Sequence, residues 1–292
     1  MEIKLPHGVR IGNVNDDFTG VTAIVFDDGA ICGCDVRGGA PGTRETALLG
    51  SDKANEHVDA VMLCGGSAYG LAATCGAMEA LLAAGKGVRV SDKIVPIVPA
   101  AVIYDLNDKE YHYPTSEMGR EAVIAAAQTV KGGKVGAGKG ATVGKILGHA
   151  NCSKSGLGVA EVTVDGAKVV AVVVVNAFGD VRKDGKIIAG ARMGDTFIDT
   201  NMAIAMADLN AKNANTTIGC IITDARLTKV QANRLAAIAH NGLAKTIYPV
   251  HTEFDGDTLF CASVGDKDVM QIKLQVACVE AVERAVWDAV NV

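Results

Sequence analysis

An apolar, β-branched run in the last third of the chain constrains the fold more than any other stretch. The run reads Asn215-Thr216-Thr217-Ile218-Gly219-Cys220-Ile221-Ile222-Thr223-Asp224. Its length and composition predict a buried strand. It opens with two hydroxyl residues directly after an asparagine, so the chain places a polar Asn-Thr-Thr step at the entrance to its core.

The Asn-Thr-Thr step has two interpretations. It is ordinary turn chemistry, in which Asn215 lies in the turn and threonine favours the extended strand. Alternatively, it hides the nucleophile of a self-cleaving hydrolase. If the bond between Asn215 and Thr216 breaks, Thr216 becomes a chain terminus with a hydroxyl and an α-amine, and the amine can act as the base for the hydroxyl.

Composition and charge exclude several classes of protein. The chain has 292 residues, 49% of them hydrophobic, which is enough for a buried core and disfavours disorder. The net charge is -5 and the basic residues are scattered, so we expect no nucleic-acid partner and no attraction to membranes. No segment resembles a signal peptide or a membrane span. We therefore expect a cytoplasmic protein.

The cysteines predict reduced thiols rather than disulfides or a metal site. Most of the eight lie in apolar segments typical of a core: Cys64, Cys75, Cys220, Cys261 and Cys278. Cys32-Gly33-Cys34 is the only close pair, and no second pair completes a zinc site. We expect no metal and no cofactor.

Because no Pro-, Ser- or charge-rich linker divides the chain, we predict one domain over residues 1–292. The patterns predict strands in hairpin pairs, at 21–26 with 30–36 around Asp27-Asp28-Gly29 and at 158–164 with 168–175. Further strands are expected at 60–63, 98–106, 215–224 and 258–263. Helices are expected after Gly70 to about 84, from Thr115 to the glycines at 132 and 133, and at 196–212, 228–244 and 267–290. This order predicts an α+β fold, a layered α/β/β/α sandwich.

Familiar signatures fail by spacing. In the glycine-dense loop 133–145, Lys139 stands where a Walker A loop needs its first glycine, and neither Ser nor Thr follows Lys145. Val143 stands where a dinucleotide fingerprint needs its last glycine. Tyr69 replaces the second glycine of a hydrolase nucleophile elbow, and the histidines lack zincin spacing.

Polar residues remain at positions where a core is normally apolar. Asn176 directly follows four valines, Asp255 and Asp257 flank Gly256 before a strand, and Lys145 ends the glycine loop. Each has a plain explanation: a strand-end turn, a hairpin turn and a solvated charge. Together they are candidate site residues.

These stretches resemble a family, the DmpA-like hydrolases. The resemblance lies in Asn-Thr-Thr-Ile-Gly at 215–219, Val-Arg-Gly-Gly-Ala-Pro-Gly-Thr-Arg-Glu at 36–45, Gly-Gly-Ser-Ala-Tyr-Gly-Leu at 65–71, Ala-Thr-Val-Gly-Lys at 141–145, Val-Asn-Ala-Phe-Gly-Asp at 175–180 and His-Thr-Glu-Phe-Asp-Gly-Asp-Thr at 251–258. The family includes an L-aminopeptidase D-alanyl-esterase/amidase, β-peptidyl aminopeptidases and the nylon-oligomer hydrolase. The threonine after Asn215 is most similar to the nylon-hydrolase branch.

The resemblance implies a precursor that cleaves itself between Asn215 and Thr216 into chains 1–215 and 216–292, which stay associated. It also implies a fold shared with ornithine acetyltransferase and a homotetramer or larger assembly. In the implied mechanism Thr216 attacks first the Asn215 carbonyl and then the amide of a small peptide or amide substrate. Its new amine has a pKa of about 8.

The resemblance assigns roles to the candidate residues. Asp255 and Asp257 orient the amine, Asn176 donates to the oxyanion, and Lys145 lies beside the nucleophile. Tyr104 matches the family's pocket tyrosine, although a core tyrosine explains it nearly as well. Two other functions stay open: an acyltransferase of the ornithine-acetyltransferase kind, and a non-catalytic protein that binds anions in loop 133–145.

Overall fold

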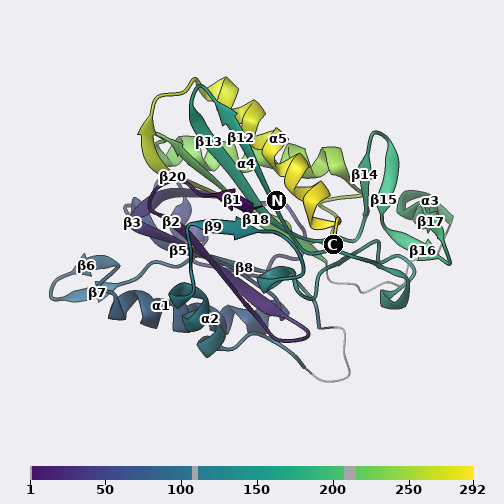
Figure 1. Cartoon of the computed structure of the whole chain (residues 1–292), viewed down its shortest axis with the longest axis horizontal. Helices are drawn as coiled ribbons and strands as arrows, with labels where there is room; N and C mark the ends of the chain where they lie inside the picture. The colour runs from purple at the N-terminus through teal and green to yellow at the C-terminus, as the bar shows by residue number, and fades with distance from the viewer. Residues whose placement is uncertain (1, 107–110, 207–214) are drawn as a thin grey trace.

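The layers of the molecule follow the predicted order. A computed structural model describes residues 2–106, 111–206 and 215–292. Two β-layers lie between two pairs of helices (Figure 1). Helices α4 (Lys229–Thr246) and α5 (Gln271–Ala289) cover one outer face, and α1 (Ala73–Ala83) and α2 (Ser116–Ile124) cover the other. The prediction of an α+β, layered α/β/β/α fold is confirmed.

One nine-stranded sheet supplies both β-layers in the described part of the chain. The layer under α4 and α5 contains β12 (Leu157–Val164), β13 (Ala167–Asn176), β18 (Thr216–Ala225) and β20 (Thr258–Lys267). The other layer contains β2 (Val9–Asn15), β5 (His57–Cys64), β8 (Ala100–Val102) and β4 (Thr43–Arg44). The long strand β3 (Gly20–Val36) joins them, because residues 21–31 pair with β5 and residues 31–36 pair with β20.

Strand β13 shows why the apolar runs are continuous rather than alternating. Val169, Val173 and Val175 face the helices α4 and α5, whereas Val170 and Val172 face the core between the two β-layers. Side chains alternate between the faces of a strand. Both faces are buried here, so the valine run and the neighbouring run in β18 have no polar face.

The predicted hairpin around Asp27-Asp28-Gly29 is wrong. Strand β3 continues through these residues, and its register against β5 shifts between Val25 and Ala30. The Asp-Asp-Gly step is therefore a bulge, at which Gly29 has a φ of +76°. A bulge and a tight turn use the same residue types, and the pairing of both flanking segments with β5 distinguishes them.

Three other elements differ from prediction because tertiary pairing overrides local pattern. The strand expected at 98–106 is only the three residues of β8. The helix that begins after Thr115 ends at Ile124, since residues 129–131 form a strand that pairs with the N-terminus of the chain. The helix expected at 196–212 begins only at Thr200, after a short strand, and residues 207–212 lie outside the described part.

The remaining elements are short. The 3₁₀ helices are Ala47–Leu49, Ser67–Ala72, Gly136–Gly138 and His149–Asn151. The short helix α3 spans Thr200–Met206. The minor strands are β1 (Glu2–Lys4), β6 (Val88–Val90), β7 (Lys93–Val95), β9 (Thr129–Lys131), β10 (Thr142–Val143), β11 (Ser153–Lys154), β14 (Asp180–Lys183), β15 (Lys186–Ala189), β16 (Ala191–Met193), β17 (Thr196–Ile198) and β19 (Ile247–Tyr248).

Close packing of α4 and α5 on the sheet depends on two glycines. A Cβ on Gly158 would lie 1.8 Å from the carbonyl oxygen of Ala285 in α5. A Cβ on Gly33 would lie 2.2 Å from the backbone nitrogen of Asn233 in α4. Glycine at these strand positions lets each helix backbone approach the sheet directly.

The cysteines can be compared with the prediction of reduced thiols in the core. All eight cysteines have free thiols, but Cys75 is exposed, so its prediction as a core residue is wrong. It faces outward from the first turns of α1, where an alanine-rich sequence carries no clear apolar stripe.

None of the described helices combines the length and apolar composition needed to cross a bilayer.

Candidate active site

The Asn-Thr-Thr step lies at the buried start of β18. Asn215 and Thr216 are 1% and 4% exposed, respectively. The antiparallel register places Thr216 opposite Asn176, the last residue of β13. On the other side, the backbone N–H of Asn215 donates to the carbonyl oxygen of Phe254 at 2.9 Å. The segment is therefore held between β13 and the turn that precedes β20.

Two hydrogen bonds converge on the carbonyl oxygen of Asn215. The backbone N–H of Gly256 donates to it at 2.8 Å, and the hydroxyl of Thr216 donates to it as well. The Thr216 hydroxyl thus contacts the carbonyl group of its own preceding peptide bond. Such an arrangement pairs a nucleophile with a donor that can stabilise negative charge on the oxygen.

Asp257 lies against the same strand. One of its carboxylate oxygens accepts from the backbone N–H of Thr217 at 2.6 Å. The other accepts from Nδ1 of His251 at 2.7 Å and from the backbone N–H of His251 at 3.1 Å. Both oxygens are therefore bonded, and the carboxylate is only 1% exposed. This carboxylate is anchored directly to the residue after the candidate nucleophile.

Asp255 is the second buried carboxylate of the turn. Its Oδ2 accepts from the backbone N–H of Thr252 at 2.9 Å and from the hydroxyl of Thr252 at 2.6 Å. Burial, reinforced by the negative charge of Asp257, raises the pKa of Asp255 to about 6. The two carboxylates therefore lie close enough within this turn for their charges to interact.

Lys145 is buried rather than solvated, being 1% exposed. Its Nζ donates to the carbonyl oxygen of Asn176 at 2.7 Å, and Asn176 is the residue opposite Thr216. Burial lowers the pKa of Lys145 to about 7, although nearby acidic groups, including Asp255, oppose that shift. The amine can therefore take up or release a proton near neutral pH.

The side chain of Asn176 is held by two backbone groups. Its Oδ1 accepts from the backbone N–H of Thr142 at 3.1 Å, and its Nδ2 donates to the carbonyl oxygen of Tyr104 at 2.8 Å. Tyr104 thus reaches the site through its backbone. No hydrogen bond recorded among the described residues joins its phenol to the other candidates.

The glycine loop supports the site instead of forming an anion cradle. Its backbone N–H groups donate to protein oxygens, for example Gly136 to Asn15 at 3.0 Å and Ala137 to Thr22 at 3.2 Å. The Lys139 N–H is also used, within the loop's own turn. These bonded donors disfavour the alternative of a non-catalytic anion-binding protein.

Sequence reasoning missed three parts of this region. Asp105 is buried beside the glycine loop, where it accepts from the hydroxyl of Thr19 at 2.8 Å and from the backbone N–H of Gly66 at 2.6 Å. The other two are the Gly256 N–H and His251. The signal for Asp105 was a carboxylate inside a predicted apolar strand. A backbone donor leaves no such signal.

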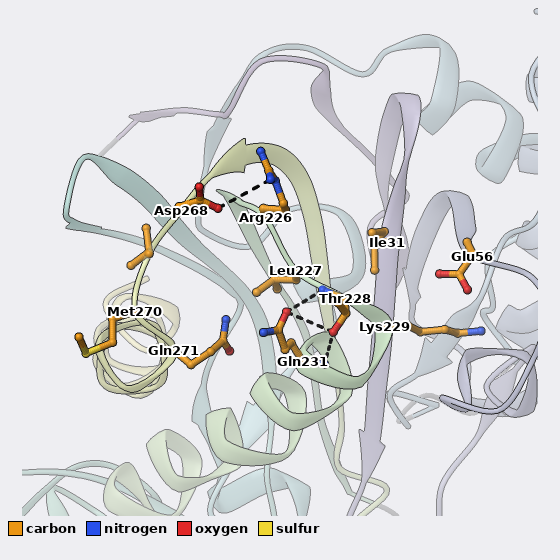
Figure 2. A pocket seen from close by; sticks show the side chains of 11 residues that line it. Ile31, Glu56, Arg226, Leu227, Thr228, Lys229, Gln231, Asp268, Met270 and Gln271 are labelled. Atoms are coloured by element: carbon orange, nitrogen blue, oxygen red, sulfur yellow. Dashed lines mark hydrogen bonds and ion pairs between the residues drawn. The ribbon is translucent and has the colours of Figure 1, made fainter.

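A separate pocket of about 640 Å³ lies at the other end of β18. Figure 2 shows its lining, in which Arg226 pairs with Asp268 at 3.9 Å and Thr228 bonds to Gln231 in a helix capping box. These polar groups are already used by one another. Since β18 is a ten-residue strand, the pocket lies about 30 Å from Thr216 and is not part of the site.

Known proteins share both the sequence and the fold. The chain is 41% identical over 263 residues to an uncharacterized aminopeptidase of Mycobacterium leprae, covering 84% of this chain and 71% of the relative. It is 32% identical over 274 residues to the 6-aminohexanoate-oligomer endohydrolase of Paenarthrobacter ureafaciens, covering 90% and 74%.

A solved structure extends the similarity of fold. The L-aminopeptidase D-Ala-esterase/amidase of Ochrobactrum anthropi superposes with a TM-score of 0.69 at 19% identity, over 98% of this chain and 86% of that one. That protein is described as a variant of the Ntn hydrolase fold. The model of Peptidase family S58 matches residues 6–292. The chain therefore belongs to peptidase family S58, which confirms the resemblance found in the sequence.

Proposed function

We propose that this protein is a self-processing amide hydrolase that uses Thr216 as an N-terminal nucleophile after cleavage of the Asn215–Thr216 bond. One observation carries the proposal: the Thr216 hydroxyl and the Gly256 N–H converge on the carbonyl oxygen of Asn215. The Gly256 N–H belongs to the parallel bridge between Asn215 and Asp255, so a fixed backbone donor lies on the same carbonyl that the Thr216 hydroxyl contacts.

In the first step Thr216 Oγ1 attacks the carbonyl carbon of Asn215, and the hydroxyl proton passes to a base. The Gly256 N–H stabilises the developing oxyanion. The carbon–nitrogen bond then breaks, the base passes the proton to the Thr216 nitrogen, which leaves as a neutral α-amine, and an ester forms between Asn215 and Thr216. Water hydrolyses the ester and leaves chains 1–215 and 216–292. Lys145, whose pKa is lowered to about 7, is the candidate base.

In the second step the freed amine serves as the base for the Thr216 hydroxyl, which attacks the substrate amide. Asp255 and Asp257 orient the amine and balance its charge. Asn176, opposite Thr216 in the ladder, donates to the oxyanion, a contribution on the order of 3 kcal/mol when such donors are removed in other enzymes.

The names of the relatives support small peptides or amides as substrates, because they include an aminopeptidase and an oligoamide endohydrolase. The proposed activity therefore includes the hydrolysis of peptide bonds and of the amide bonds of oligoamides. A panel of aminoacyl amides, short peptides and 6-aminohexanoate oligomers, with and without amine acceptors, separates hydrolysis from acyl transfer.

Mass spectrometry of the purified protein tests the first step. The wild type should yield two fragments that begin at Met1 and Thr216, and Thr216→Ala should stay intact and inactive. Thr217→Ala is the matched control, because it removes the neighbouring buried hydroxyl and should still cleave. A wild-type chain that remains at 30.0 kDa after prolonged incubation contradicts the proposal.

A further inference from the structure

His251 lies behind the candidate site, and within the described part of the chain its hydrogen bonds to the site run to Asp257. Its imidazole is mostly buried, with 17% of the side chain exposed. Nδ1 and the backbone N–H both lie on Asp257 Oδ2, at 2.7 and 3.1 Å. The opposite oxygen of the same carboxylate receives the Thr217 N–H. One carboxylate thus links His251 to the strand that begins at Thr216.

The contact favours one tautomer of the ring. A carboxylate oxygen accepts hydrogen bonds, so the tautomer with the hydrogen on Nδ1 is the one that can donate to Asp257. The Nε2 atom is buried and has no hydrogen-bond partner among the described residues. The hydrogen bonding of the ring is therefore directed at Asp257 alone.

The backbone at His251 has an uncommon conformation. His251 has a φ of +58°, in the left-handed region, which few residues other than glycine adopt and in which asparagine, aspartate and histidine are enriched. Histidine therefore suits this turn, and the turn directs its imidazole onto Asp257.

A second histidine, His240, packs against the ring of His251. The ring of His240 meets that of His251 edge to face, with 4.8 Å between centroids, and its Nε2 lies 3.1 Å from the carbonyl oxygen of Asp35. Burial lowers the pKa of His240 to about 4, so this ring is neutral near pH 7. It packs against His251 without adding a competing positive charge.

We propose that His251 is a positioning residue of the hydrolase, which holds Asp257 so that this carboxylate fixes the first peptide of β18 and the amine of Thr216. The inference rests on the proposed function for its catalytic consequence. His251 itself touches neither the nucleophile nor the substrate. Its role is to keep one carboxylate oxygen on Thr217 while the other is held from behind.

The matched variants are His251→Asn and His251→Asp. Both side chains have the same shape and suit a positive φ, but only asparagine can donate to Asp257 from an atom equivalent to Nδ1. We expect His251→Asn to retain self-cleavage and kcat. We expect His251→Asp to lose about tenfold to a hundredfold in kcat with little change in KM, since a hydrogen bond to a charged group is replaced by repulsion.

Equal activity of the two variants, whether both high or both low, overturns the inference while leaving the proposed function in place. A wild type that neither cleaves nor hydrolyses amides removes the proposed function instead. In that case the contact is tested by NMR of the ¹⁵N-histidine-labelled protein. We expect a downfield Nδ1 proton that is absent in His251→Asn and displaced in Asp257→Asn, and its absence from the wild type overturns the inference.

Discussion

Gly256 lies directly against Thr216: a Cβ at position 256 would be 2.8 Å from Thr216 Oγ1. The same Cβ would lie 2.7 Å from the backbone oxygen of Ala40, so it has no room to move away from Thr216. Gly256→Ala should therefore displace the hydroxyl from the Asn215 carbonyl and slow self-cleavage by about a hundredfold, the scale of losing one oxyanion contact. The measurement is the rate of fragment appearance in freshly purified protein. Gly50→Ala is the control, since its tightest Cβ contact would be the flexible side chain of exposed Asp52 at 2.9 Å, and the nearest backbone atom, the Ala47 oxygen, would lie at 3.4 Å. Equal rates for the two variants would show that the space beside Thr216 is not needed.

Self-cleavage should accelerate as the pH rises through about 7. The pKa of Lys145 is lowered to about 7, so its neutral, proton-accepting form becomes dominant above that pH. Asp255, with a pKa raised to about 6, becomes charged slightly earlier. Rates from quenched samples between pH 5.5 and 9 measure the profile. Lys145→Arg keeps the charge at every pH and should remove the rise. A rise that persists in this variant assigns the base to another group.

The same lysine links stability to pH. An unfolded lysine titrates near 10.5, whereas the folded group titrates near 7. Between these values the unfolded chain binds more protons, so this group makes the protein more stable as the pH rises. Denaturant titrations of an uncleaved Thr216→Ala protein at pH 7 and 9, with and without Lys145→Met, should show a pH-dependent gain only when Lys145 is present.

Asp105 should give the opposite dependence. Burial raises its pKa from 3.8 to about 6, so the folded state favours the protonated form. Its stabilising contribution is complete below pH 3.8 and is lost as the pH rises through 6, by up to on the order of 3 kcal/mol. Asp105→Asn does not titrate and should lose less stability over this window, measured by chemical denaturation. Parallel pH profiles for the two proteins would contradict the assignment.

Lys229 should contribute to stability through three carbonyl contacts. Its Nζ donates to the carbonyl oxygens of Leu48, Lys53 and Asn55 at 3.0, 3.1 and 2.6 Å, and the residue is 5% exposed. Lys229→Met should lower the free energy of unfolding by about 2 kcal/mol and Tm by about 4 to 8 °C. Lys245→Met is the control on the same helix. Its side chain is 61% exposed, so the change should stay within about 0.5 kcal/mol. Similar losses of unfolding free energy in both variants would contradict a stabilising role for the three carbonyl contacts of Lys229.

The sequence predicted the elements whose signal is local. Strands β13 and β18 are apolar on both faces, and α4 begins after Thr228, where the structure adds a capping box with Gln231. Strand β3 escaped prediction, because an Asp-Gly step serves equally as a turn or a bulge. Its final residues pair with β20, more than two hundred positions later in the chain, and no local pattern carries that information.

The candidate site likewise has parts that the sequence predicts and parts that it does not. Asn176, Lys145 and the two aspartates could be singled out because a polar residue in apolar surroundings is visible in the sequence. Their arrangement could not, since it depends on the register that sets Thr216 opposite Asn176. The Gly256 N–H and the left-handed backbone of His251 belong to the main chain and have no residue-type signature.

The passage of β3 through both β-layers has a mechanical consequence. Layers built from separate sheets can slide past each other at the expense of side-chain packing alone. Here any such sliding would break backbone hydrogen bonds of β3, which pairs with β5 along its first half and with β20 along its second. The Tyr104 carbonyl, in the segment that follows β8, therefore keeps its alignment with Asn176 at the end of β13, and the molecule resists distortion along the seam where these residues meet.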